Sequence, residues 1–230
     1  TISISAVILV DMTQYVHRGE KKAALELFKK AAIKSAAILF PVMIFLLVTG
    51  KSFIVTLYSE KYLESIIPFY IYLFILPIRI VIYGSALMAL GQSKVILIRS
   101  VFDLIINIIL SIILVHFIGY LGAAISTVLT LYFWTTPYNL FKIGKGFRVS
   151  PLKTLPFKEL VHILFLSLIP VPFALLNLLL PSNAYFFKLL LSAFIYFPII
   201  GVLLLKYKFL EIPIRYHNYI PDFIRSNLLS

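Results

Sequence analysis

Six long apolar stretches follow one another along this chain, and each is long enough to cross a lipid bilayer as a helix. A bilayer core about 30 Å thick requires about 20 helical residues. The six stretches are residues 33–57, 66–90, 95–118, 120–142, 159–181 and 184–206, and residues 1–13 have the composition of the end of a seventh. Hydrophobic residues make up 61% of the chain and charged residues 13%, so a water-soluble fold would expose too much apolar surface. We therefore expect an all-α, polytopic bundle of transmembrane helices.

The two ends of the chain differ from these stretches. The opening segment TISISAVILV is apolar but lacks the basic leading region of a signal peptide. We interpret it as starting inside a membrane helix, and we expect the chain to be the C-terminal part of a longer protein. The tail mixes aromatic residues, prolines and cations, which is typical of a segment at the membrane surface. The expected organisation is a membrane domain over residues 1–206 and a cytoplasmic interfacial tail over residues 207–230.

Glycines mark turns between the apolar stretches. Gly91 follows the expected end of a helix, and Gly119 and Gly122 supply a turn within the segment IGYLG. Gly122 also lies four residues before Ser126, and small residues at this spacing let two helix backbones approach closely. Pro41 lies inside the first full stretch, where its missing N–H predicts a kink. We assign these glycines and Pro41 to packing and helix shape.

Lys and Arg are distributed very unevenly between the two expected faces of the membrane. Seventeen of the 21 basic residues fall on one set of alternate helix ends, three fall on the other, and Arg79 lies within a stretch. Such a bias predicts that the first set, and with it the C-terminus, is cytoplasmic. The net charge of +12 is therefore a topology signal, and we do not expect nucleic acid as a partner. The seventeen are Arg18, Lys21, Lys22, Lys29, Lys30, Lys34, Lys94, Arg99, Lys142, Lys145, Arg148, Lys153, Lys158, Lys206, Lys208, Arg215 and Arg225.

Arg79 is the only charged residue in the range 65–93, although a guanidinium is costly in hydrocarbon. Asp103 lies in the next stretch. At 1.5 Å per residue, the two residues lie roughly 16 and 12 Å from the same membrane face. Buried opposite charges usually pair, so we predict an ion pair between them. Three interpretations stay open: a purely structural pair, a pair that also lines a transport route, and two unpaired residues.

Two further polar residues are candidates for a substrate site. Lys34 is the last cation of a charged helix that continues into the first full stretch. It either extends its amino group to anionic headgroups or faces an aqueous cavity. Asn107 lies one turn beyond Asp103 and either extends the predicted network or hydrogen-bonds a neighbouring helix, the latter being the favoured role.

No motif for catalysis or for a cofactor is present in the sequence. The chain contains no cysteine, no glycine loop of the type that binds phosphate and no His cluster at metal-ligand spacing. The loops expected on the non-cytoplasmic side are short, so no outer domain is available for chemistry. We therefore expect no cofactor, no metal and no enzymatic activity.

The run ALMALGQSKVILIRSVFDLIINIILSIILVHFIGYLGAAISTVLTLYF, residues 86–133, resembles the C-terminal region of polysaccharide flippases. These belong to the multidrug, oligosaccharidyl-lipid and polysaccharide exporter superfamily. The preceding segment ILFPVMIFLLVTGKSFIVTLYSEKY also resembles the helix that the family has before this region. Since no single motif is diagnostic, the resemblance depends on order and spacing over about residues 23–206. The matching turns and helix start are Ala89-Leu90-Gly91 with Lys94, Asn107 to Ser111, and Gly119 to Val128.

The resemblance implies two helical lobes, about twelve to fourteen helices in all, around a cavity that opens alternately to each face of the membrane. Such proteins move an undecaprenyl-linked sugar intermediate across the bacterial inner membrane. This chain would supply the C-terminal lobe. Its partners would be membrane lipid, the lipid-linked sugar and a missing N-terminal lobe of the same protein.

The resemblance assigns no cavity residue, so the candidate substrate-binding residues depend on physical arguments. Arg79 would bind phosphate bidentately, exchanging between Asp103 and the substrate, and Lys34 would guide the anion near the cytoplasmic mouth. A cation-coupled multidrug exporter of the same superfamily is the nearest alternative, and an acidic cavity would favour it. A membrane polysaccharide polymerase or glycosyltransferase is less favoured, because such enzymes usually need a large outer loop or dispersed acidic residues.

Overall fold

The computed structural model describes residues 2–175, 181 and 184–209. The end of the predicted stretch 159–181 and most of the predicted tail 207–230 lie outside these residues. Within the described residues the chain forms helices and turns, which confirms the all-α fold class.

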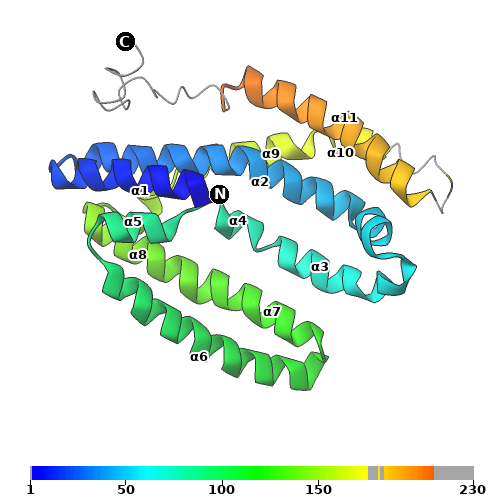
Figure 1. Ribbon diagram of the computed structural model, residues 1–230, viewed down its shortest axis with the longest axis horizontal. Helices are drawn as coiled ribbons and strands as arrows, with labels where there is room; N and C mark the ends of the chain where they lie inside the picture. Colours follow the sequence, from blue (N-terminus) through cyan, green and yellow to red (C-terminus); the bar gives the residue numbers. More distant parts are fainter. Residues whose placement is uncertain (1, 176–180, 182–183, 210–230) are drawn as a thin grey trace, which may run out of the picture.

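The helices follow one another with short connections (Figure 1). The first half of the chain forms α1 (Ile2–His17), α2 (Lys21–Tyr58), the 3-10 segment η1 (Glu60–Ser65), α3 (Ile66–Leu73), α4 (Leu76–Arg79) and α5 (Tyr83–Ala89). The second half forms α6 (Ser93–Ile118), α7 (Leu121–Thr130), the π-helical segment η2 (Leu131–Thr135), α8 (Thr136–Phe147), the 3-10 segment η3 (Pro151–Lys153), α9 (Phe157–Leu168), α10 (Val171–Ala174) and α11 (Tyr185–Lys206).

Four helical segments of the described chain are long and apolar enough to cross a membrane. A fifth is added if the segments Glu60–Leu73 and Leu76–Ala89, which meet at a bend of 41°, form one broken span. The chain is therefore compatible with a membrane protein. The four segments are α2, α6, Phe157–Ala174 and α11.

The stretch predicted at 120–142 is helical but is not one regular helix. Its backbone runs from α7 through the π-helical segment η2 into α8 without a non-helical residue. Pro137 lies in the first turn of α8, and its missing N–H prevents a regular α-helical bond to the preceding turn. This accounts for a wider turn at that position.

The helix α2 is the centre of the bundle. It contacts α1, α9, α11 and η1, and its buried face supplies much of the apolar core. The helix is continuous from Lys21 to Tyr58, including Pro41, so the charged segment before residue 33 and the apolar stretch after it form one element.

The hairpin of α6 and α7 lies on the other side of the molecule from α9 and α11, with α3 between the hairpin and α2 (Figure 1). A Cβ atom on Gly122 would overlap the backbone of α6 at Leu114 and Val115. Only glycine permits this approach, which confirms the predicted packing role of Gly122. Gly91 and Gly119 have φ values of +70° and +63° and end α5 and α6, as their positions in the sequence predict.

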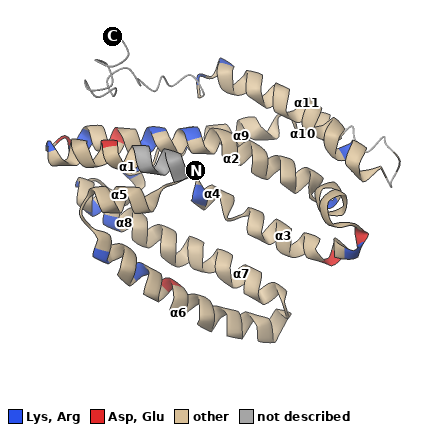
Figure 2. Cartoon of the chain, in the orientation of Figure 1, with Lys and Arg blue, Asp and Glu red and all other residues tan. Residues whose placement is uncertain are grey.

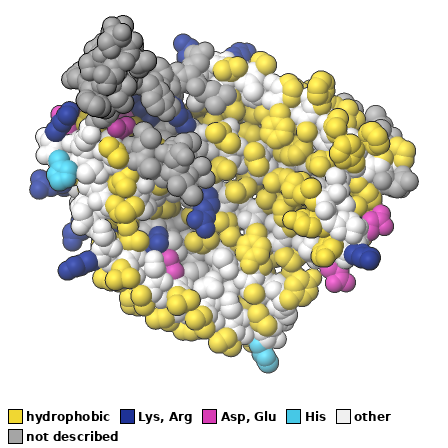
Figure 3. Space-filling model, viewed as in Figure 1, with side chains coloured by type: hydrophobic (Ala, Val, Ile, Leu, Met, Phe, Trp, Pro, Cys, Tyr) yellow, Lys and Arg dark blue, Asp and Glu magenta, His cyan; other side chains and the backbone are white. Residues whose placement is uncertain are grey.

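The two ends of the bundle differ in their content of charged residues (Figure 2). Lys and Arg gather at the end where α2, α6 and α9 begin and α8 and α11 end, which we call the basic end. Few cations lie at the opposite end. The face between the ends is dominated by apolar side chains (Figure 3).

Candidate functional site

The segment between α3 and α5 departs most from the expected continuous span 66–90. Pro77 lies in the first turn of α4 and cannot donate the hydrogen bond that would continue α3. The N–H of Ile78 instead donates to Ile75 at 3.0 Å, which leaves the carbonyl of Phe74 without its helical partner. The hydroxyl of Tyr132 donates to that carbonyl at 2.8 Å. The side chain of Tyr132, from η2, therefore supplies a donor to the carbonyl that the first break in the helix leaves free.

A second break directly follows Arg79. Residues 80–82 are not helical, and α5 begins at Tyr83. Arg79 itself ends α4, and its side chain is exposed. Within the described residues, Arg79 takes part in no ion pair or side-chain hydrogen bond that the structure records.

The predicted ion pair between Arg79 and Asp103 is absent. Asp103 instead pairs with Arg99, one turn earlier on the same helix, with 3.4 Å between Arg99 Nε and Asp103 Oδ2. Residues four apart lie on one face of a helix, so Arg99 reaches the carboxylate with little rearrangement. The depth calculation for Arg79 assumed a continuous helix, and the two breaks around α4 remove that assumption.

Asp103 and Arg99 belong to a row of polar contacts between α6 and the helical run α7–η2–α8, which we call the polar seam. Residues 99, 103, 107 and 111 lie four apart and share one face of α6. Each meets a polar side chain across the interface. The contacts are Arg99 Nη1 to Asn139 Oδ1 at 3.4 Å, Thr135 Oγ1 to Asp103 Oδ1 at 2.9 Å, Asn107 Nδ2 to Thr127 Oγ1 at 3.3 Å, and Ser111 Oγ to Ser126 Oγ at 2.6 Å.

The π-helical segment η2 positions Thr135 for its contact with Asp103. Thr135 is its last residue, and the side-chain oxygen lies 3.3 Å from the carbonyl oxygen of Thr130, five residues earlier. Asn139 follows one turn later and is fully buried, and its Nδ2 has no hydrogen-bond partner within the described residues. The seam is therefore buried on the α8 side, and its Asn139 amide retains a free donor.

The other two candidate residues, Asn107 and Lys34, have no recorded contact with each other. Asn107 hydrogen-bonds the neighbouring helix α7, which confirms the favoured interpretation of that residue. Lys34 lies half-buried on α2, seven residues before Pro41, and no recorded contact links it to Arg79 or Asp103. The four candidates therefore do not form one cluster.

Sequence reasoning missed the partners on the second side of the seam. Thr135 and Asn139 looked like ordinary polar residues of an apolar stretch, and Arg99 was counted only as a topology charge. The recurrence of polar residues at every fourth position from 99 to 111 was the available signal for one common face.

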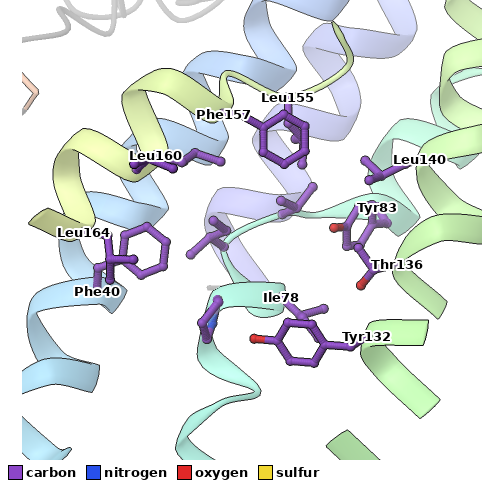
Figure 4. Close-up of a pocket in the computed structure, with 14 residues that line it drawn as sticks. Phe40, Ile78, Tyr83, Tyr132, Thr136, Leu140, Leu155, Phe157, Leu160 and Leu164 are labelled. Atoms are coloured by element: carbon purple, nitrogen blue, oxygen red, sulfur yellow. The ribbon is translucent and has the colours of Figure 1, made fainter. Parts of the chain in front are cut away.

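A cavity of about 210 Å³ lies beside the broken span. Figure 4 shows Phe40 and Leu164 on one side of it and Tyr83 and Thr136 on the other. Arg79 does not line the cavity, although its neighbours Ile78 and Ile80 do. The lining is almost wholly apolar.

Comparison with known proteins adds no family assignment to these observations. No known family, no curated protein and no solved structure matches this chain significantly.

Proposed function

We propose that this chain forms part of a transporter that flips a lipid-linked oligosaccharide across the bacterial inner membrane by alternating access. The observation that carries the proposal is Arg79, an exposed guanidinium without a carboxylate partner in the described residues, at the end of a short helix in a broken apolar segment.

An unpaired guanidinium is incompatible with a purely hydrocarbon surrounding. Charged residues within transmembrane segments almost always face the interior of a bundle or a water-filled cavity. Non-helical backbone at membrane depth is likewise tolerated only where it is covered by protein or borders water. Ile80 and Val81 in the break are buried by the protein, whereas Arg79 is exposed. On this proposal, the face that bears Arg79 borders a wet central cavity completed by an N-terminal lobe.

The charge of Arg79 favours an anionic cargo. Asp103 is neutralised by Arg99 and contacts Thr135, so it does not compete for Arg79. The guanidinium is then available for bidentate binding of a phosphate group, as expected for a pyrophosphate-linked sugar. Lys34, half-buried nearer the basic end, would attract the same anion at the mouth of the cavity. This revises the expected mechanism, because no exchange of Arg79 with Asp103 is needed.

The orientation of the proposed transporter follows from its charges. The basic end faces the cytoplasm, which also makes the C-terminus cytoplasmic. A multidrug exporter would instead require an acidic cavity. The deep carboxylate Asp103 is already paired, so no observation favours that alternative or a polymerase.

Substitution of Arg79 tests the proposal. We expect Arg79→Ala to reduce transport about tenfold or more, because removal of one partner from a charged contact costs several kcal/mol. Arg79→Lys keeps the charge but loses the bidentate geometry, so we expect an intermediate rate. The measurement is the amount of lipid-linked oligosaccharide exposed on the outer leaflet of cells that produce the variant.

Lys61→Ala is the matched control, because Lys61 is an exposed cation in η1, which follows the end of α2 opposite the basic end. It should leave transport unchanged. Normal transport by Arg79→Ala at normal protein level would refute the proposed role of Arg79.

A further inference from the structure

The cavity beside the broken span has the shape of a slot that runs along two helices. Phe157, Leu160, Val161 and Leu164 line it from one face of α9, since they lie at helical spacings of three, four and seven. Seven residues of helix correspond to about 10 Å of length. Tyr132, Thr136 and Leu140 line the opposite wall from η2 and α8, each one turn from the next.

The two ends of the slot differ. Ile78, Ile80 and Val81 of the broken span lie against its inner wall. Leu155 and Phe157 line the end toward the basic end of the bundle, where α8 finishes and α9 begins (Figure 4). The slot therefore extends from the loop between α8 and α9 toward the break that follows Arg79.

An apolar cavity of this size favours a hydrocarbon occupant over water. An apolar cavity of about 150 Å³ stays dry and binds benzene, and this slot has a volume of about 210 Å³. Phe157 and Val161 are 40% and 48% exposed, so the slot is open along α9 to the surroundings of the bundle. In a bilayer those surroundings are acyl chains.

Cations lie close in sequence to Leu155 and Phe157, which line this end of the slot. Arg148, Lys153 and Lys158 are exposed, and the structure records no ion pair for any of them within the described residues. Glu159 is the one acidic residue in the range 148–159, which leaves this region with a positive balance. Lys21 also reaches this end, where its Nζ donates to the carbonyl of Gly146 at 3.1 Å.

We propose that the slot binds an anionic phospholipid of the bilayer, with one acyl chain between α8 and α9 and the headgroup among the cations of residues 148–158. The apolar lining selects hydrocarbon, and the cations select a negative headgroup over a zwitterionic one. The chain end would contact Ile78 and Val81, so the lipid would support the broken span from the side that Arg79 does not occupy. This inference is independent of the proposed transport function.

A tryptophan reporter in reconstituted membranes tests the proposal. The chain has a single tryptophan, so Trp134→Phe combined with Phe157→Trp gives one emitter at the mouth of the slot. Trp134→Phe combined with Leu97→Trp gives a matched emitter on α6. Leu97 is 67% exposed and close in sequence to two cations, Lys94 and Arg99, but it lines no recorded cavity.

Each protein is placed in phosphatidylcholine vesicles that contain increasing fractions of phosphatidylglycerol with brominated acyl chains, which quench tryptophan on contact. We expect half-maximal quenching of the Phe157→Trp reporter at a phosphatidylglycerol fraction several-fold lower than for the Leu97→Trp reporter. Equal fractions for the two reporters would overturn the proposal, as would equal quenching by brominated phosphatidylcholine.

The headgroup contact is tested by charge removal in the same reporter. Arg148→Gln, Lys153→Gln and Lys158→Gln together should raise the required phosphatidylglycerol fraction to that of the α6 reporter. The control set Lys51→Gln, Lys61→Gln and Lys188→Gln removes three cations from the opposite end and should change nothing. An unchanged curve for the first set would overturn the assigned headgroup position. If that set fails to fold, the two reporters with unchanged cations still decide whether the slot binds the lipid.

Discussion

Arg79 and Arg99 carry the same charge in very different surroundings. Arg99 lies one turn from Asp103 and also contacts Asn139, so its charge is compensated within the chain. Arg79 is exposed at the end of α4 and has no such partner in the described residues. A charge that is already paired supports structure, whereas an unpaired charge remains available for a ligand.

A double-mutant cycle tests which arginine holds Asp103. We expect Arg99→Met and Asp103→Leu to show a coupling free energy of about 0.5–3 kcal/mol, because each single change leaves the other charge without its partner. The measurement is denaturation of the detergent-solubilised protein.

The matched cycle pairs Arg79→Met with Asp103→Leu. Its two effects should add within about 0.5 kcal/mol, as for residues that share no contact. Strong coupling in this second cycle would contradict the arrangement in the structure.

The sequence reveals which charged residues are unusual, but it does not reveal which residues pair with them. It identified both Arg79 and Asp103 as exceptional, because composition alone reveals a charge in an apolar stretch. The predicted partner is wrong because an ion pair depends on side-chain reach, and the distribution of basic residues predicts Arg99, the actual partner, at the membrane surface.

At the scale of elements, the broken span depends on a contact from another helix. Pro77 prevents α3 from continuing, and Tyr132 donates to the exposed carbonyl of Phe74. Such breaks are tolerated in membrane helices where a neighbour satisfies the freed backbone groups. The position of η2 therefore helps to determine where the broken span can break.

Removal of the Tyr132 hydroxyl tests this dependence. We expect Tyr132→Phe to lower the free energy of unfolding by about 0.5–1.5 kcal/mol, the net contribution of one hydrogen bond, because this bond is exposed at the surface of the bundle. In a Pro77→Ala background the helix can continue, and the N–H of Ile78 can serve the Phe74 carbonyl. The same Tyr132→Phe change should then cost much less, and an equal cost in both backgrounds would count against the explanation. The measurement is again denaturation in detergent.

Element types were easier to predict than interruptions. Long apolar runs indicated helices because hydrocarbon allows the backbone few alternatives. The sequence also contained the cause of two irregularities, Pro77 at the first break of one run and Pro137 at the π-helical turn of the other, whereas no proline marks the second break at residues 80–82. The exact break remained open, because a membrane helix can bend around a proline or separate there, and α2 continues through Pro41 without interruption.

At the scale of the whole molecule, the gathering of cations at one end gives the bundle a direction. Alternate helix ends return to the basic end, in agreement with the alternation in the sequence (Figure 2). This alternation extends over the whole described chain, so it was predictable from the sequence. The packing of α6 against α7 and the slot beside α9 were not, because both depend on how side chains from distant segments fit together.

Cysteine labelling tests the orientation of the bundle. The chain contains no cysteine, so Ser59→Cys and Ser150→Cys each introduce a single thiol at an exposed position, at opposite ends. If the basic end is cytoplasmic, a membrane-impermeant maleimide added to intact cells should label the Ser59→Cys variant and not the Ser150→Cys variant. Labelling of both after permeabilisation is the control, and the reverse pattern in intact cells would invert the proposed topology.

The charge-free region from residue 104 to residue 141 has a mechanical consequence for the α6–α7 hairpin. Lys94 in α6 and Lys142 in α8, which continues α7 through η2, anchor the hairpin near one interface, whereas its tip at Gly119 carries no ionic anchor. A bilayer that becomes thinner or thicker would therefore shift the tip relative to the lipid while the legs keep their depth. A change in membrane thickness would therefore alter the surroundings of the hairpin tip and leave those of the anchored end unchanged.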